Sequence, residues 1–210
     1  MSEPAAATPK TPHVGRREAK ALRRTALLRA AASLFAEHGF TDVSMEDLGM
    51  AVGMSGPAVY RHFPSKQAVL AALLIDVSQD LLDGGAAEVD RAPDSELALR
   101  ALVGFHVAFA LDRRDVIRVQ DHDLDSLTPE DSRTVRTLQR RYVERWVDVL
   151  SDLHPGTPTP QLRIRAHAGF GLINSTPHSA ALRADREDTL ERQAVRTTLE
   201  QMALAALLAR

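Results

Sequence analysis

Residues 41–66, TDVSMEDLGMAVGMSGPAVYRHFPSK, contain the strongest local structure signals in the chain. Ser44 stands before an apolar-periodic run and three residues before Asp47, which is the spacing of a capping box at a helix start. Gly53 predicts the end of that helix, because glycine tolerates the positive φ found at helix C-termini. The expected buried face of this first short helix carries Leu48 and Ala51.

A second short helix is expected directly after the turn. Ser55 suits its N-cap, and the glycine and proline that follow suit a first turn, where a missing N–H costs little. Val59 and Phe63 are spaced i, i+4 and are expected to share a buried face. Pro64 should end the helix, and Ser65 can cap the next one. Two short helices joined by a turn with glycine form the helix-turn-helix layout of DNA-binding proteins.

Two stretches, ALLRAAASLFAEHGF at 26–40 and VSMEDLGMAVGMSGPAVYRHFPSKQAVL at 43–70, resemble the tetracycline-repressor (TetR) family of bacterial transcriptional regulators. The helix caps, the turn glycine, the Tyr-x-x-Phe pair and the Ser-Lys pair all occur in register. The remainder resembles the family only in helical character and length. The resemblance implies an all-α protein with an N-terminal three-helix helix-turn-helix domain at 16–64 and a C-terminal helical ligand-binding and dimerisation domain at 65–210.

The composition favours a globular helical protein. Hydrophobic residues make up 44% of the chain and aromatic residues 4%, and Ala, Leu, Arg and Glu, which favour helices over sheets, are abundant. The chain has no cysteine, which excludes disulfides and thiolate metal sites. No apolar run approaches the ~20 residues of a membrane span, and the N-terminus lacks the apolar core of a signal peptide. We therefore expect a cytoplasmic protein with no membrane partner.

Charge is unevenly distributed along the sequence. The whole chain carries a net charge of −2, but residues 16–70 contain eight Lys or Arg and five Asp or Glu, which gives +3. Residues 1–15 balance, so residues 71–210 carry −5. The positive excess lies with the helix-turn-helix, where phosphate contacts need it, although an excess of this size is also ordinary for a solvated surface.

A tail and a first helix precede the helix-turn-helix. Residues 1–15 are rich in proline and small residues without periodicity and are expected to form a disordered tail, with an arm that touches DNA as the alternative. A helix is expected over 16–38, ended by Gly39. Its basic first half opposes the helix dipole; a phosphate backbone alongside would compensate, and a solvated face is the other interpretation. The basic residues are Arg16, Arg17, Lys20, Arg23, Arg24 and Arg29, and the expected packing residues are Leu27, Ala31, Leu34, Phe35 and His38.

Helical patterns continue to the end of the chain. A helix from Ser65 to about Leu82 is expected to end at Gly84 and Gly85, and in proteins that resemble this one it links the two domains. Further helices are expected near 94–112, 115–125, 129–152, 159–176 and 186–209.

The last two expected helices indicate self-association. Residues 162–175 carry small residues that let another helix approach closely, and residues 189–208 are apolar over a wide arc. We expect a two-fold homodimer through a four-helix interface, as the resemblance also implies. Such a dimer would present two recognition helices about 34–36 Å apart. The alternative is a monomer that buries the same faces internally.

The candidate DNA-binding residues lie on and around the second short helix. The N-terminal end of that helix, which reads base edges in such motifs, carries Ser55, Gly56, Pro57 and Ala58. Glycine lets the backbone approach the groove, the proline and the alanine offer apolar contact to thymine methyls, and the serine can bond a base or a phosphate. Arg61 is the long donor that can reach guanine. The resemblance implies phosphate contacts for Ser44, Tyr60, His62 and Lys66. Capping by the serines and half-buried packing by the tyrosine are the structural alternatives.

The second domain is expected to hold a small apolar or amphipathic effector in a mostly apolar cavity with a few polar groups. The candidate lining residues are Phe105, His106, Phe109, Arg118, His122, Tyr142, Trp146, Phe170 and Asn174. Aromatic pairs at i, i+4 among them are more often core than pocket. The stretch INSTPHS at 173–179 either lines a ligand mouth or caps a helix end.

The sequence favours neither a metal site nor catalysis. Asp121, His122, Asp123 and Asp125 offer oxygen and nitrogen ligands, but a polar helix end is the simpler interpretation. The chain has no G-x-S-x-G, P-loop, H-E-x-x-H or dinucleotide fingerprint. We expect a non-enzyme without a cofactor.

Together these features predict a ligand-responsive regulator, a repressor, that binds pseudo-palindromic operator DNA as a dimer. Ligand binding would move the helix at 65–82 and change the placement of the two recognition helices. Two other classes remain open: a helical small-molecule binder whose helix-turn-helix is only scaffold, and an architectural protein that coats DNA without ligand control.

Overall fold

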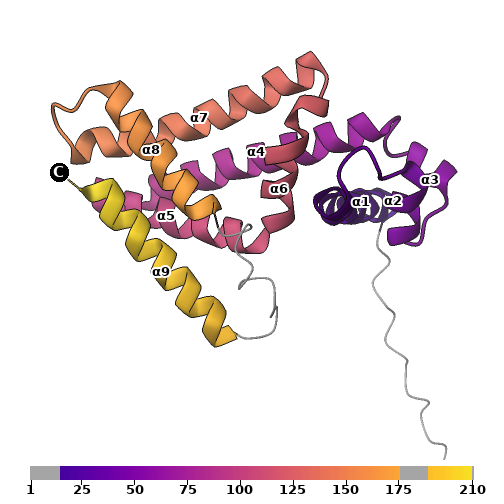
Figure 1. The fold of residues 1–210 in the computed structure, drawn as a ribbon, viewed down its shortest axis with the longest axis horizontal. Helices are drawn as coiled ribbons and strands as arrows, with labels where there is room; N and C mark the ends of the chain where they lie inside the picture. The colour runs from indigo at the N-terminus through magenta and orange to yellow at the C-terminus, as the bar shows by residue number, and fades with distance from the viewer. Residues whose placement is uncertain (1–14, 176–188, 210) are drawn as a thin grey trace, which may run out of the picture.

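The computed structural model describes residues 15–175 and 189–209, and within them it contains helices and no strand, which confirms the predicted all-α class (Figure 1). The helices are α1 Arg16–His38, α2 Met45–Ala51, α3 Gly56–Tyr60, α4 Lys66–Arg91, α5 Ser95–Asp112, α6 Arg114–Asp123, the 3-10 helix η1 Leu124–Ser126, α7 Pro129–Leu153, α8 Thr159–Asn174 and α9 Thr189–Leu208. The predicted tail, apart from Gly15, and the polar stretch after Ser175 lie outside the described residues. None of the described helices combines the length and apolar character needed to cross a bilayer.

Side-chain caps set the helix starts that the sequence predicted. Ser44 Oγ accepts a hydrogen bond from the Asp47 N–H at 3.1 Å, and the Asp47 carboxylate accepts one from the Ser44 N–H at 2.8 Å, so the capping box is present. The caps of α4, α5 and α7 are Ser65, Asp94 and Thr128. Ser55 precedes α3 as expected, but its hydroxyl makes no capping hydrogen bond.

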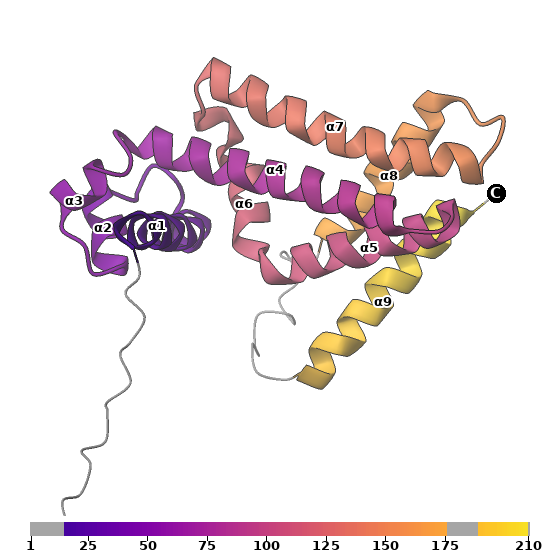
Figure 2. The same ribbon diagram turned by 180° about the vertical axis from the view of Figure 1, so that it is seen from behind.

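Two hydrophobic clusters fill the described structure, and α4 belongs to both. One cluster joins α1, α2, α3 and the first half of α4 to parts of α6 and α7. Val59 and Phe63 lie in it, 0% and 4% exposed, as their spacing predicted. The other cluster joins the second half of α4 to α5, α7, α8 and α9. Figure 2 shows α4 running from the helix-turn-helix end alongside α7 into the far half of the molecule. The domain boundary predicted near residue 65 therefore coincides with the start of α4, a helix that contributes to both hydrophobic clusters.

Helix α4 is longer than the sequence predicted, because Gly84 and Gly85 do not end it and it continues to Arg91. A Cβ on Gly84 would lie 2.4 Å from the Phe105 ring of α5, and a Cβ on Gly85 would lie 2.5 Å from the Tyr142 ring of α7. The two glycines therefore serve close helix packing rather than helix termination.

Three smaller expectations are wrong. Helix α3 ends at Tyr60, well before Pro64, because the chain already turns at residues 61–62. Ala51 and His38 are exposed rather than buried, since each lies at the last residue of its helix, where the chain leaves the packed face.

Replacement of Gly85 by alanine is expected to destabilise the protein, although alanine is the better helix former. The added methyl would overlap the buried Tyr142 ring, and overpacking of this kind costs about 1–3 kcal/mol. Gly104→Ala is the matched control, because its Cβ would meet nothing closer than 3.6 Å and should gain about 0.5–1 kcal/mol from helix propensity. Urea unfolding of both variants measures the difference; equal effects would contradict the packing role.

Candidate nucleic-acid interface

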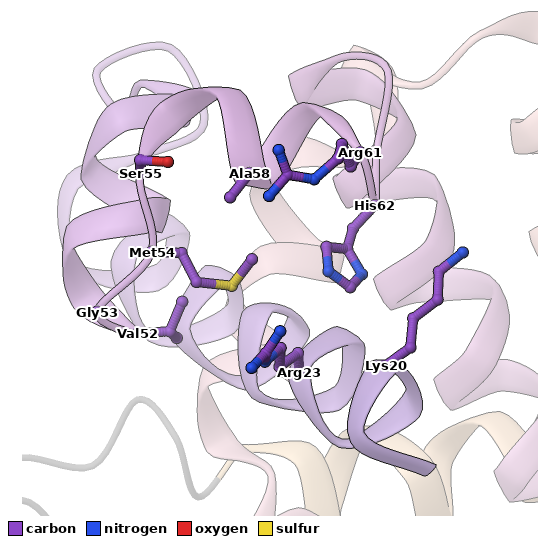
Figure 3. Close-up of a pocket in the computed structure, with 9 residues that line it drawn as sticks. All are labelled: Lys20, Arg23, Val52, Gly53, Met54, Ser55, Ala58, Arg61 and His62. Carbon is purple, nitrogen blue, oxygen red and sulfur yellow. The ribbon is translucent and has the colours of Figure 1, made fainter. Parts of the chain in front are cut away.

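Helix α1, the turn between α2 and α3, and the end of α3 enclose an open pocket of about 750 Å³ (Figure 3). Lys20 and Arg23 line it from α1, and Arg61 and His62 line it from the residues that follow α3. Figure 3 shows Lys20 and Arg23 on the helix below the pocket and Arg61 and His62 above it, with the Lys20 ammonium turned away from the Arg61 guanidinium. Among the described residues that line the pocket none is acidic, so the pocket matches the charge and donor preferences of a phosphate group.

The structure separates the basic residues of α1 that the sequence grouped together. Lys20 and Arg23 are exposed in the pocket beside α3. Arg24 instead pairs with Asp76 of α4, with 2.6 Å between Nη1 and Oδ2. Arg29 borders a different groove, between α1, α4 and α6. The sequence placed Lys20 and Arg23 in a basic helix half that a phosphate backbone could face, but it did not distinguish them from the other basic residues there, because helical periodicity does not tell which face of α1 lies against α3.

The leading turn of α3 is accessible as the sequence predicted, with one exception. Ser55 and Pro57 are exposed, and Gly56 is half-buried. Ala58 is only 9% exposed, because it lies on the side of the helix that turns inward with Val59. Of the two residues predicted to contact thymine methyls, Pro57 is therefore the better placed. The Ser55 hydroxyl, free of a capping role, has its donor and acceptors available.

The other flank of α3 borders a shallower pocket of about 430 Å³, lined by Ser44, Tyr60 and Lys66 among others. Tyr60 is 51% exposed, which fits both a phosphate contact and the half-buried packing alternative. Lys66 Nζ donates to the Thr41 carbonyl at 2.9 Å and lies 4.6 Å from the centre of the Phe40 ring. An ammonium has three donors, so this anchored lysine retains N–H groups for a phosphate.

Among the residues that line the pocket of about 750 Å³, His62 is the one whose side chain titrates near neutral pH. Its partial burial, followed by the charges of Lys20, Arg23 and Arg61, lowers the pKa of His62 below its ordinary value of 6.5. An anion in the pocket would reverse the electrostatic balance and raise the pKa.

The predicted ligand residues meet only in part. The rings of His106, Tyr142, Trp146 and Phe170 lie 4.8–6.2 Å apart, centre to centre, between α5, α7 and α8. Asn174 joins this aromatic cluster, with 3.2 Å between its Oδ1 and His106 Nε2, and the Tyr142 hydroxyl lies 3.3 Å from His106 Nδ1.

Burial lowers the pKa of His106 to about 4, so its ring is neutral at pH 7. Nε2–H then donates to the Asn174 carbonyl oxygen, and Nδ1 accepts from the Tyr142 hydroxyl.

The remaining predicted ligand residues lie at the edge of the aromatic cluster or outside it. The centres of the Phe109 and His106 rings lie 5.9 Å apart, whereas the Phe105 ring packs over Gly84. Arg118 and His122 lie on α6, which packs chiefly on α1, and His122 is exposed. Helical patterns locate residues along the chain, and they do not tell which helices become neighbours.

The acidic run near the end of α6 is divided between α6 and η1. Within residues 15–175 and 189–209, no three His, Asp or Glu side chains are gathered closely enough to hold a metal ion.

Two family models match the chain. Residues 27–73 match the model described as bacterial regulatory proteins, tetR family, and residues 93–178 match the model described as tetracyclin repressor-like, C-terminal domain. A curated relative, the HTH-type transcriptional repressor KstR2 of Rhodococcus jostii, is 29% identical over 132 residues, which span 62% of this chain and 65% of KstR2. The match therefore spans slightly less than two thirds of that relative.

Solved structures share the fold. A TetR-family transcriptional regulator from Bordetella parapertussis superposes with a TM-score of 0.75 at 22% identity, over 86% of this chain and 93% of that chain. AibR, in complex with isovaleryl coenzyme A and operator DNA, superposes with a TM-score of 0.68 at 18% identity, over 86% of this chain and 97% of that chain.

Removal of Arg23 or Lys66 should weaken binding to every duplex sequence alike. Each lost phosphate contact is expected to reduce the slope of log K against log salt concentration by about one. Binding titrations at several salt concentrations test this for Arg23→Ala and Lys66→Ala. Arg145→Ala, an exposed arginine of α7, makes the same charge change far from α3 and should leave the slope unchanged. A slope that falls equally in all three variants would contradict the assignment.

The low pKa of His62 predicts proton uptake when DNA binds. A phosphate in the pocket raises that pKa, so affinity should increase as the pH falls through the DNA-bound pKa toward the lower pKa of the free protein, by at most about tenfold per pH unit for each recognition helix. Titrations at constant ionic strength measure the profile. His62→Gln should flatten it; parallel profiles for the two proteins would rule out this role.

Proposed function

We propose that this chain, which belongs to the TetR family of bacterial transcriptional regulators, is a repressor that binds operator DNA as a dimer and leaves it when a small molecule binds. The observation that carries the DNA-binding part is the pocket beside α3, where Lys20, Arg23, Arg61 and His62 lie next to an accessible leading turn. Phosphate contacts would fix the register of the protein on the duplex, and the leading turn would read bases in the major groove.

The outer faces of α8 and α9 support a dimer. Ile164 of α8 is 68% exposed, and Leu190 and Met202 of α9 are 82% and 52% exposed. The small residues Ala168 and Gly171 of α8 are also exposed. Large apolar side chains beside small ones on two adjacent helices suit close packing against the same pair in a second copy. A two-fold dimer would bring two α3 helices to one face of an inverted repeat.

The aromatic cluster between α5, α7 and α8 supports a ligand with an apolar body. Trp146 is fully buried, and its Nε1–H makes no hydrogen bond of good geometry, with only a weak interaction to the Tyr142 side chain. Gln139 Nε2, two turns earlier on the same face of α7, is likewise buried without a partner. An unmade hydrogen bond of a buried group costs about 1–3 kcal/mol, so an acceptor oxygen supplied by a ligand would recover that energy. Because His106 is neutral, it could not balance a negative charge buried in this cluster. The part of the ligand that carries the acceptor oxygen would therefore be uncharged.

Coupling between the two ends would pass through α4 and α6. Helix α4 contributes to both hydrophobic clusters. Helix α6 places Val116 and Val119 in the cluster of the helix-turn-helix, and its Asp115 accepts a hydrogen bond from Ser33 of α1 at 2.8 Å. A ligand that separates α5, α7 and α8 would shift α4 and α6 and so the tilt of α3. Operator and ligand would then weaken each other by the same factor.

The experiment begins with selection of duplexes from a random library. The wild-type protein should enrich an inverted repeat whose half-sites lie one helical turn, or a multiple of it, apart. Ile164→Asp should sediment as a monomer and bind the repeat no better than a single half-site. Leu97→Asp, which alters an exposed leucine of α5, should remain dimeric. A library that yields no preferred sequence would favour an architectural protein over a repressor.

The same duplex then serves to find the ligand. Neutral apolar compounds with an acceptor oxygen should release the protein from the selected duplex. Trp146→Phe keeps an aromatic ring and removes the donor, so it should raise the required compound concentration roughly 5- to 150-fold, which corresponds to the recovered energy of about 1–3 kcal/mol. A compound that saturates the protein without changing its operator affinity would favour the small-molecule binder over the ligand-released repressor.

A further inference from the structure

We propose that Glu46, the second residue of α2, selects a cytosine in each half-site by accepting a hydrogen bond from the cytosine amino group. This inference rests on the proposed function, because it requires the leading turn of α3 to enter a major groove. Glu46 was not among the residues that the sequence singled out for DNA contact.

The position of Glu46 follows from how closely α2 approaches α3. A Cβ on Gly49 of α2 would lie 2.6 Å from the Met54 carbonyl oxygen, and the Met54 N–H donates to the Gly49 carbonyl at 2.8 Å. Any larger residue at Gly49 would push the turn away. Glu46 lies three residues before Gly49, so the two share the face of α2 that meets α3.

The carboxylate of Glu46 reaches the first turn of α3. A Cβ on Gly56 would lie 3.3 Å from Glu46 Oε1 and 3.7 Å from its Cδ. Gly56 is the first residue of α3, between the exposed Ser55 and Pro57, and Glu46 is itself exposed. The acidic side chain therefore belongs to the surface that enters the groove.

The neighbouring acid has a structural task that Glu46 does not share. The Asp47 carboxylate completes the capping box with Ser44, accepting from its N–H at 2.8 Å and from its hydroxyl at 2.6 Å. These hydrogen bonds lower the pKa of Asp47. Since Asp47 caps α2, the Glu46 carboxylate is available to a partner outside the protein.

The chemistry of a carboxylate limits which base it can read. An ionised carboxylate only accepts hydrogen bonds. In the major groove guanine offers two acceptors and thymine offers an acceptor and a methyl group, whereas cytosine offers the N4 amino donor. Adenine places an acceptor, N7, beside its amino group, which opposes a carboxylate. Cytosine is thus the base that matches Glu46.

The cations that flank α3 make an acid tolerable at this place. Phosphates on both strands repel a carboxylate in the groove, and Lys20, Arg23 and Arg61 on one flank and Lys66 on the other offset that repulsion. The repulsion that remains is the same for every sequence, but at the operator the hydrogen bond from cytosine offsets it. Glu46 would therefore lower the affinity for duplexes without the cytosine more than the affinity for the operator.

The test compares the base preferences of variants on random duplexes and then on the selected operator. The wild-type protein should require one cytosine per half-site, and exchanging that C·G pair for T·A should weaken its binding about 5- to 150-fold. Glu46→Gln should shift the preference at that position to adenine, because glutamine pairs with adenine N6 and N7. Glu46→Ala should lose the preference at that position alone. Asp42→Asn is the matched control, since it removes an exposed acid of the same shallow pocket and should keep the cytosine.

The outcomes separate this inference from the proposed function. If the wild-type protein enriches an inverted repeat and Glu46→Ala keeps every base preference, Glu46 does not read DNA while the repressor proposal stands. If Glu46→Ala binds all duplexes more tightly with unchanged preferences, the carboxylate acts only by general repulsion and the inference is overturned. If the wild-type protein enriches no sequence, the proposed function itself fails. Circular dichroism of each variant verifies that α2 remains folded.

Discussion

The close approach of α4 to α5 and α7 at Gly84 and Gly85 is the constraint on which the rest of the structure depends. The absence of two side chains lets the Phe105 and Tyr142 rings lie against the α4 backbone. Because α4 has 26 residues and rises about 1.5 Å per residue, it spans about 39 Å without a break. One rigid element therefore contacts the aromatic cluster through its C-terminal half and begins a few residues after α3. A change at either end has to move the whole helix or break its packing.

At the recognition end, opposite charges are placed for different tasks. The chain is slightly acidic as a whole, with a net charge of −2, yet the described residues beside α3 form a pocket lined by three permanent cations and a histidine. Cations facing phosphates supply affinity without regard to sequence. In the proposed complex, a single carboxylate at the leading turn would add little affinity and much discrimination, because it would penalise every base pair without a matching donor. The net charge of the whole chain reveals neither the cluster of cations nor the single carboxylate.

The interior of the second half carries polar groups where an ordinary core would be apolar. His106 is 3% exposed and hydrogen-bonded to Asn174 and Tyr142, and the buried Trp146 N–H makes no hydrogen bond of good geometry. Buried polar groups cost free energy unless they are satisfied. Their concentration between α5, α7 and α8, of which α5 and α7 pack against α4, is the arrangement expected of a site that gains hydrogen bonds when it is filled.

Local signals in the sequence determined which segments are helical and where most of them begin. The capping box at Ser44, the cap at Ser65, and the i, i+4 pair Val59 and Phe63 depend on residues a few positions apart, so the sequence displays them directly. The family motif rests on the same short stretch. Tertiary structure alone decided that Gly84 and Gly85 continue a helix, that Lys20 and Arg23 face α3 while Arg24 turns to α4, and that Glu46 lies over Gly56. Each of these facts concerns which helix becomes a neighbour, and that choice follows from packing between residues far apart in the chain, which no local pattern encodes.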